Sequence, residues 1–275
     1  MLHYSDKVIL PIGIEVDGIR YREVIIDEMT GVDEENLVSK KVRNNGAKAV
    51  TLLLQRCIQE VTGLIDRKSN SLSLIDERIV RNMYVADRDY LTICIRALSD
   101  RSEFESEVTC PSCNSSSNLN MDVKEMDVYD WDEESPAQIE LELPRGFWSK
   151  ETNSYHSKIT WKFPKGSTQE KLSSLPEDQI ATRSMLAGIV KVEGMSSLPT
   201  AEDVRRLSLR ERRAFAEALS AESVGVDTKI SLTCPDCSHE FSTEVSMMNF
   251  FNLGGSETKS RSVSGKSGRR LRKRT

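Results

Sequence analysis

Two cysteine pairs carry the most specific chemical pattern in this sequence. Both have the form Cys-Pro-x-Cys, at Cys110 and Cys113 and again at Cys234 and Cys237. A turn with this spacing points two thiolates at one ion, and the backbone amides of the turn stabilise negative charge on sulfur. Two such turns supply the four sulfur ligands of a closed, tetrahedral structural site. We therefore predict that these four cysteines bind one Zn²⁺.

Other interpretations of the two pairs remain open from the sequence. The same thiolates suit an iron–sulfur cluster, each pair alone has the spacing of a redox-active dithiol, and both could be metal-free relics. His239, beside the second pair, is an alternative ligand. Asn114 and Ser238 stand where a glycine commonly ends such a turn, and Ser adopts the left-handed conformation less readily than Asn. Cys57 and Cys94 lie on apolar faces of predicted helices, where we expect small buried side chains.

The segments around each cysteine pair alternate between apolar and polar residues, which predicts a β-hairpin with the pair at its tip. A helix is predicted before each hairpin, with Asp87 and Ser208 as N-caps and a capping box between Ser208 and Glu211. The two helices align at an offset of 121 residues and the cysteines at 124. This difference predicts a three-residue insertion between helix and hairpin.

A third correspondence lies farther upstream. Residues 29–37 parallel residues 164–172 at an offset of 135, and each segment follows a predicted strand pair. In the first pair, Asp17-Gly18 is a tight-turn signal, whereas a longer loop is expected in the second. Helices are predicted to follow over residues 47–61 and 180–192, because apolar side chains recur there at helical spacing.

These repeated patterns predict an α+β protein with an internal duplication. Each half would contain a β-hairpin, helices and a Cys-Pro-x-Cys hairpin, and the two pseudo-symmetric halves would be joined by the zinc-knuckle pair. The predicted division is a first half at 1–126, an acidic linker at 127–137, a second half at 138–253 and a basic, disordered tail at 254–275.

Composition excludes several classes of protein. The 275 residues are 38% hydrophobic, but no apolar run approaches the length of a membrane span, and the N-terminus lacks a secretory pattern. The net charge of −5 conceals a tail with eight basic residues against one acid after residue 253. Such a tail suits nucleic acid or an acidic protein partner.

The sequence offers no pattern for catalysis. Glycine-rich phosphate loops and the nucleophile-elbow motif are absent from it, and its three histidines are His3, His156 and His239, far apart along the chain. A site closed by four sulfurs leaves zinc no open position for water. We predict a protein that is not an enzyme.

Four segments together resemble a known family: residues 9–18, 29–35, 87–91 and 108–113. They are similar to the baseplate hub or hub-assembly proteins of T-even-type, contractile-tailed bacteriophages, most clearly over residues 8–126. The resemblance implies a role in tail assembly with other hub proteins in an oligomeric complex, located in the virion or in the host cytoplasm during assembly. A zinc-ribbon regulator that binds nucleic acid through its basic tail is the alternative.

Overall fold

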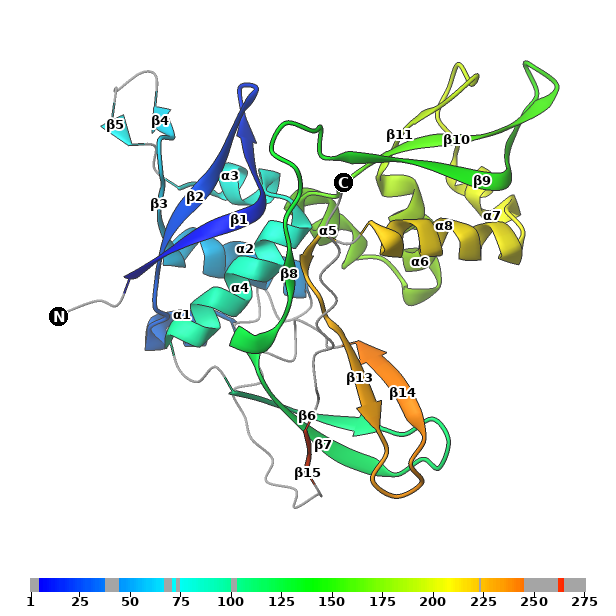
Figure 1. Ribbon diagram of the computed structural model, residues 1–275. Coiled ribbons are helices and arrows are strands. Elements are labelled where there is room, and N and C mark those ends of the chain that lie inside the picture. The colour runs from blue at the N-terminus through cyan, green and yellow to red at the C-terminus, as the bar shows by residue number, and fades with distance from the viewer. Residues whose placement is uncertain are drawn as a thin grey trace.

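The computed structural model describes residues 5–37, 45–66, 71–72, 75–99, 103–222, 224–244 and 262–264. It is an α+β protein, as predicted, with small sheets and short helices. Two lobes lie side by side, and a third lobe made of two hairpins lies below them in Figure 1. Within the described ranges, none of the helices combines the length and apolar character needed to cross a membrane.

The first lobe is built on a three-stranded antiparallel sheet. Strands β1 (Ser5–Val16) and β2 (Ile19–Asp27) form the predicted hairpin, and β3 (Ile58–Val61) pairs with β2. Asp17 and Gly18 have φ values of 51° and 79°, as a tight hairpin turn requires. The remaining elements of this lobe are α1 (Gly31–Leu37), α2 (Gly46–Cys57), β4 (Ile65–Asp66), β5 (Ser71–Leu72), α3 (Glu77–Asn82) and α4 (Val85–Ser99).

The second lobe repeats this arrangement. Its sheet contains β9 (Gln138–Ser149), β10 (Ser154–Lys162) and β11 (Ile189–Val192), joined in the same order as β1, β2 and β3. The loop between β9 and β10 is shorter than predicted, because both strands extend beyond their expected ends. The helices of this lobe are α5 (Gly166–Leu172), α6 (Glu177–Ala187), α7 (Ala201–Arg206) and α8 (Leu209–Ala221).

Element bounds correspond closely between the two lobes. Strands β1 and β9 have equal lengths at an offset of 133 residues, and β2 and β10 do so at 135. Helices α1 and α5 are related by 135, β3 and β11 by 131, and α3 and α7 by 124. Glycines with positive φ recur as well, Gly13 matching Gly146 and Gly63 matching Gly194. Each lobe has its own apolar core.

Two helices end earlier than the sequence pattern predicts. The helix predicted over residues 47–61 ends at Cys57, and Ile58–Val61 continues as β3 against β2. The helix predicted over 180–192 ends at Ala187, before β11. In both strands the first and last residues are buried apolar side chains, a spacing that also fits one helical turn. The unpaired edges of β2 and β10 decide the outcome, because they satisfy the backbone of a third strand.

The predicted N-cap at Asp87 is wrong. Helix α4 begins at Val85, and Asp87 lies fully buried in its first turn, where it accepts the backbone N–H of Ile12 at 2.7 Å and that of Gly13 at 3.0 Å. The capping box of Ser208 and Glu211 in α8 is confirmed.

Glu211 is the structural equivalent of Asp87. It also accepts the N–H of Gly146, at 2.6 Å, and it holds the same place in the first turn of α8. The two helices therefore align at an offset of 124, the same as the cysteines, and the predicted three-residue insertion does not exist.

The knuckle lobe consists of the two cysteine-bearing hairpins. Strands β6 (Glu103–Thr109) and β7 (Ser116–Asp122) form one hairpin, and β13 (Lys229–Thr233) and β14 (Glu240–Glu244) form the other. The segment between the lobes contains η1 (Val123–Glu125) and β8 (Val128–Tyr129), which pairs with β12 (Gly225–Val226). Of the predicted basic tail only β15 (Ser262–Ser264), parallel to β7, is described.

Candidate metal centre

The two cysteine turns have the same backbone geometry. In the first, the N–H of Asn114 donates to the carbonyl of Cys110 at 2.9 Å, and in the second the N–H of Ser238 donates to Cys234 at the same distance. Asn114 and Ser238 both have φ of 58°, the left-handed conformation that the turn demands. Both cysteine turns therefore form without glycine at this position, and Ser238 adopts the left-handed conformation although serine does so less readily than asparagine.

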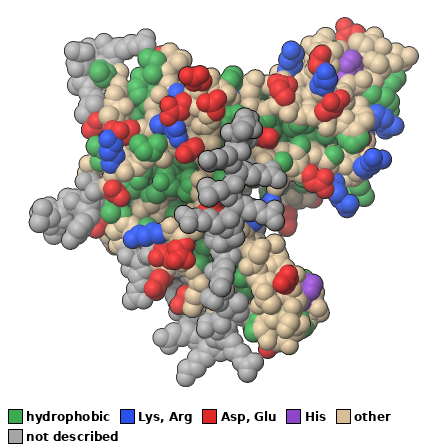
Figure 2. All heavy atoms as spheres, viewed as in Figure 1, with side chains coloured by type: hydrophobic (Ala, Val, Ile, Leu, Met, Phe, Trp, Pro, Cys, Tyr) green, Lys and Arg blue, Asp and Glu red, His purple; other side chains and the backbone are tan. Residues whose placement is uncertain are grey.

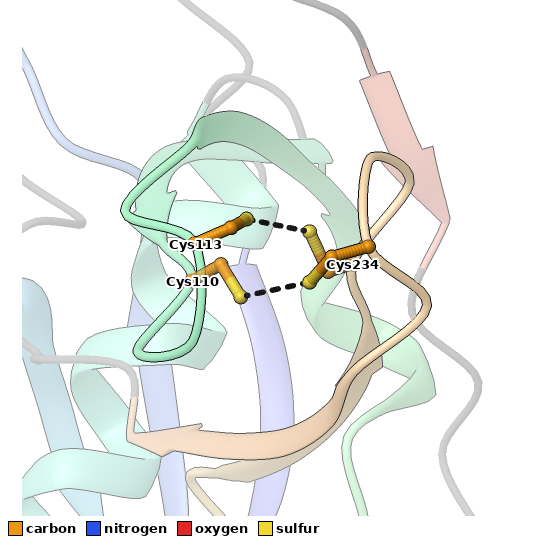
Figure 3. Close-up of side chains that lie close together, drawn as sticks. Cys110, Cys113 and Cys234 are labelled. Atoms are coloured by element: carbon orange, nitrogen blue, oxygen red, sulfur yellow. Dashed lines mark hydrogen bonds between the residues drawn. The ribbon is translucent and has the colours of Figure 1, made fainter.

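The turns face each other and bring the four predicted cysteines into one cluster (Figure 3). All four Sγ atoms lie within 4.8 Å of one another. The Sγ atoms of Cys110 and Cys237 are 3.7 Å apart, and those of Cys113 and Cys234 are 3.6 Å apart. Sulfurs bound tetrahedrally at about 2.3 Å from one Zn²⁺ would be separated by about 3.8 Å. The cluster therefore has the dimensions of a four-sulfur metal site.

Burial differs between the two members of each pair. Cys110 and Cys234 are buried, whereas Cys113 and Cys237 are exposed. A small apolar core supports the inner pair, formed by Val108, Leu119, Ile230, Leu232 and Phe241 among others. In the view of Figure 2, charged side chains are sparse over the β13–β14 hairpin and more frequent over β9 and β10. Apolar packing thus holds the turns in place, while the outer cysteines face solvent.

Hydrogen bonds set the acidity of the thiols. The Ser115 hydroxyl and the N–H of Cys237 lower the pKa of Cys234 to about 6, and hydrogen bonds with Ser115 lower the pKa of Cys113. A backbone hydrogen bond at His239 acts to lower the pKa of Cys237, but slight desolvation and hydrogen bonds with the thiols of Cys113, Cys234 and Cys110 outweigh it and raise the pKa to about 12. Because charges this close repel, the cluster needs a cation to hold all four sulfurs as thiolates.

Ser115 is the residue at this site that the sequence pattern missed. Its hydroxyl lies 3.0 Å from the Sγ of Cys113 and 3.4 Å from that of Cys234, so it links one turn to the other. The only signal in the sequence is its place two residues after Cys113, which says nothing of the second turn. The His239 ring stacks on Phe241, and His239 is not among the clustered ligand groups of the described residues.

The other two cysteines lie away from the cluster, as predicted. Cys57 is buried in the core of the first lobe, and burial raises its pKa to about 12. Cys94 packs partly buried against the same core, where burial raises its pKa to about 11. Both remain neutral thiols at physiological pH, as expected of small apolar core residues.

Comparison with known proteins identifies a family. The model of a family described as T4 bacteriophage base plate protein matches residues 9–192, about two thirds of the chain. This range runs from β1 to the end of β11, so it includes the first cysteine pair and ends before the second. No curated protein and no solved structure gives a match.

Proposed function

This chain belongs to the T4 bacteriophage base plate protein family, and from that premise we propose that it is a structural or assembly protein of the baseplate hub of a contractile phage tail. In this proposal it is not an enzyme, its partners are other hub proteins, and it acts in the virion or in the host cytoplasm during assembly. The alternative role in nucleic-acid binding depends on the basic tail, most of which lies outside the described residues, and it stays a prediction of the sequence.

The proposed cofactor is one Zn²⁺ bound by Cys110, Cys113, Cys234 and Cys237. The observation that carries it is the pair of Sγ–Sγ distances, 3.7 and 3.6 Å, across two turns that are more than 100 residues apart in sequence. Four thiolates and no open position are typical of a structural zinc site. The bound ion would crosslink the two hairpins and stabilise the knuckle lobe by about 10 kcal/mol, on the scale of zinc-finger peptides.

We also propose that the two lobes descend from one duplicated unit. Equal sheet order, equal lengths in five pairs of elements and matched positive-φ glycines support this. Side chains add to it, because Asp87 and Glu211 bind the glycine of the first strand in each lobe. The division into residues 1–126, a linker at 127–137, residues 138–253 and a tail at 254–275 remains part of this proposal.

Native mass spectrometry tests the metal site. We expect one zinc per chain in the wild type and little or none in Cys234→Ser, while the matched control Cys94→Ser, outside the cluster, keeps its zinc. A metal-free wild type with reactive or disulfide-bonded cysteines would refute the zinc proposal. A mass increase that matches an iron–sulfur cluster would show that the four cysteines bind such a cluster instead of zinc.

Complementation tests the role in the tail. In a phage that lacks this chain, we expect electron microscopy to show tails without complete baseplates, restored by the wild-type chain and by Cys94→Ser but poorly by Cys234→Ser. Normal, infectious tails without the chain would contradict the proposed role, whatever the metal content.

A further inference from the structure

Helix α5 belongs to the second lobe in sequence, yet it packs against α2, α3 and α4 of the first lobe. Glu170 is buried in this contact. Thr51 Oγ1 donates to one carboxylate oxygen of Glu170 at 2.6 Å, and Arg81 Nε lies 3.0 Å from the other. Beside it, Arg88 Nε donates to the side-chain oxygen of Gln169 at 3.3 Å. Three first-lobe residues therefore hold two adjacent side chains of α5.

The backbone before α5 contributes to the same contact. The N–H of Gly166 donates to Met83 and the N–H of Val85 donates to Pro164, both at 2.9 Å. A Cβ on Gly166 would lie 2.6 to 2.8 Å from the guanidinium of Arg88, which is closer than real contacts allow. Only glycine lets the chain approach Arg88 this closely.

The second lobe repeats the residues that receive α5. Thr182, Arg205 and Arg212 stand at the positions of Thr51, Arg81 and Arg88. Arg212 Nη1 donates to Thr182 Oγ1 at 3.2 Å and to the carbonyl of Val204 at 3.4 Å, the contacts that Arg88 makes to Thr51 and Val80. The second-lobe docking face, as we call it, consists of Thr182, Arg205, Arg212 and the turn at residues 207–209.

The rim of this face is open in the part of the chain that the structure describes, whereas Thr182 at its base is buried and hydrogen-bonded to Arg212. Leu209 is 85% exposed and the Arg205 side chain 53% exposed. In the first lobe, Val85 at the position of Leu209 donates its N–H to Pro164, in the short segment between β10 and α5. The second lobe has the receiving residues without the helix.

A groove of about 540 Å³ continues the open surface, with Trp148 and Tyr155 among its lining residues. Both aromatic side chains are more than 40% exposed. In the first lobe, Arg20 at the position of Tyr155 donates to the backbone carbonyls of residues 132, 133 and 135, in the segment that leads to the second lobe. In the first lobe, the segment at residues 132–135 therefore covers the surface that corresponds to this groove.

Helix α1 repeats the docking features of α5. Glu34 and Glu35 stand at the positions of Gln169 and Glu170, and both are exposed. Gly31 replaces Gly166, and a Cβ there would have no atom within 4 Å. Val32 next to it is 56% exposed. Asp33 instead faces α2 of its own lobe through an ion pair with Arg56, so the opposite side of α1 is uncovered among the described residues.

We propose that α1 of a second copy of this chain docks on the second-lobe docking face, as α5 docks on the first lobe. Glu35 takes the position of Glu170 beside Arg205, which forms an ion pair with Glu202 in the single chain, and Glu34 lies opposite Arg212. The acidic helix and the basic face are complementary in charge. This inference builds on the proposed repeat and assembly role, and it does not involve the metal.

The contact joins two different surfaces, so copies associate head to tail. Such heterologous contacts form a ring if the rotation closes and a filament if it does not. Each copy contributes one α1 and one docking face, which permits a test with complementary variants.

Sedimentation velocity on the full, metal-loaded chain tests the proposal. We expect the wild type to form oligomers as its concentration rises. Gly31→Trp, which has room in the monomer, and Arg205→Glu, on an exposed side chain, should each weaken association by at least about tenfold. Glu217→Arg, a charge reversal elsewhere on α8, should not. Circular dichroism and zinc content identify any variant that fails to fold.

Mixing the two weakened variants gives the sharper result. Gly31→Trp retains a working docking face and Arg205→Glu retains a working α1, so the mixture should form a one-to-one dimer and nothing larger. Glu35→Lys serves as a second α1 variant if Gly31→Trp is misfolded. A wild type that stays monomeric, or oligomers that Gly31→Trp and Arg205→Glu leave unchanged, would overturn the proposal while the metal content stays as it was.

Discussion

Arg88 and Arg212 occupy equivalent places in α4 and α8, and each reaches the matching threonine and valine carbonyl in its own lobe. Yet Arg88 is completely buried, whereas Arg212 is partly exposed. The difference comes from α5, which covers Arg88 and supplies Gln169 as a further acceptor. The same local structure thus yields a structural core residue in one lobe and a surface residue in the other.

The equivalent acids differ in a related way. Asp87 binds two N–H groups of β1 and is fully buried, while Glu211 binds one N–H of β9 and also caps its own helix. Asp87 therefore makes only tertiary hydrogen bonds, whereas Glu211 makes one tertiary hydrogen bond and also caps its own helix. These paired differences suggest three measurements, in order of expected effect.

Truncation of the two arginines should have unequal effects on the free energy of unfolding. Arg88→Met removes a buried cation near Glu170 and should cost about 3–5 kcal/mol. Arg212→Met removes a partly exposed one and should cost less than about 1 kcal/mol. Urea denaturation of each variant measures both. Equal losses would show that α5 does not decide the role of Arg88.

Alanine substitution of the paired glycines sharpens the comparison of the sheets. A Cβ at Gly146 would lie 1.9 Å from the backbone oxygen of His156, so β10 must move and the loss should be about 3 kcal/mol or more. At Gly13 the nearest atoms are the backbone oxygen of Tyr21 and the Cγ atoms of Arg20 and Arg22, all at 2.9 Å, so a shift of a few tenths of an ångström suffices and the φ strain of about 1–3 kcal/mol is the main cost. Thermal unfolding should therefore rank Gly146→Ala below Gly13→Ala.

The pH dependence of stability should have opposite signs at two acids. Burial raises the pKa of Asp87 to about 7, against the N–H donors of Ile12 and Gly13. The folded state then holds a proton that the unfolded state loses near pH 4, so this contribution falls as pH rises from about 4 to 7. Asp87→Asn should remove that decline in denaturation curves recorded across this range.

Asp203 in α7 provides the contrast. Partial burial acts to raise its pKa, but hydrogen bonds from the Thr200 hydroxyl and N–H outweigh burial and lower it. Its stabilising contribution is therefore present above about pH 4 and is lost as pH falls through the lowered pKa. Asp203→Asn should therefore lower stability at neutral pH and have little effect at a pH below the lowered pKa. If the two variants changed the slope of stability against pH in the same direction, the proposed environments of Asp87 and Asp203 would be wrong.

Much of the local structure is predictable from the sequence. The Asp17-Gly18 turn, the cysteine-tipped hairpins and the capping box at Ser208 and Glu211 are all confirmed. Each involves residues within a few positions of one another, so backbone preference and short-range hydrogen bonds determine it. The candidate metal ligands were predictable for the same reason within each pair.

Long-range choices were not predictable in this way. Residues 58–61 fit a helix by periodicity, but the free edge of β2 makes them a strand. Aspartate is a residue type favoured at helix N-caps, but the hydrogen-bond partners of Asp87 are about 75 residues away in sequence. No spacing in the sequence reports which strand edge or buried N–H group a segment will meet.

The sequence by itself determined the hairpins, the turn types, the capping box and two potential half-sites of paired thiols, because these depend on neighbouring residues. Only the tertiary structure decided that the four sulfurs lie within 4.8 Å, that Ser115 bridges the turns, and that α5 covers one arginine while its equivalent stays open. The physical reason is that docking of distant surfaces selects among local conformations of similar energy, and that selection leaves no mark in the spacing of residues along the chain.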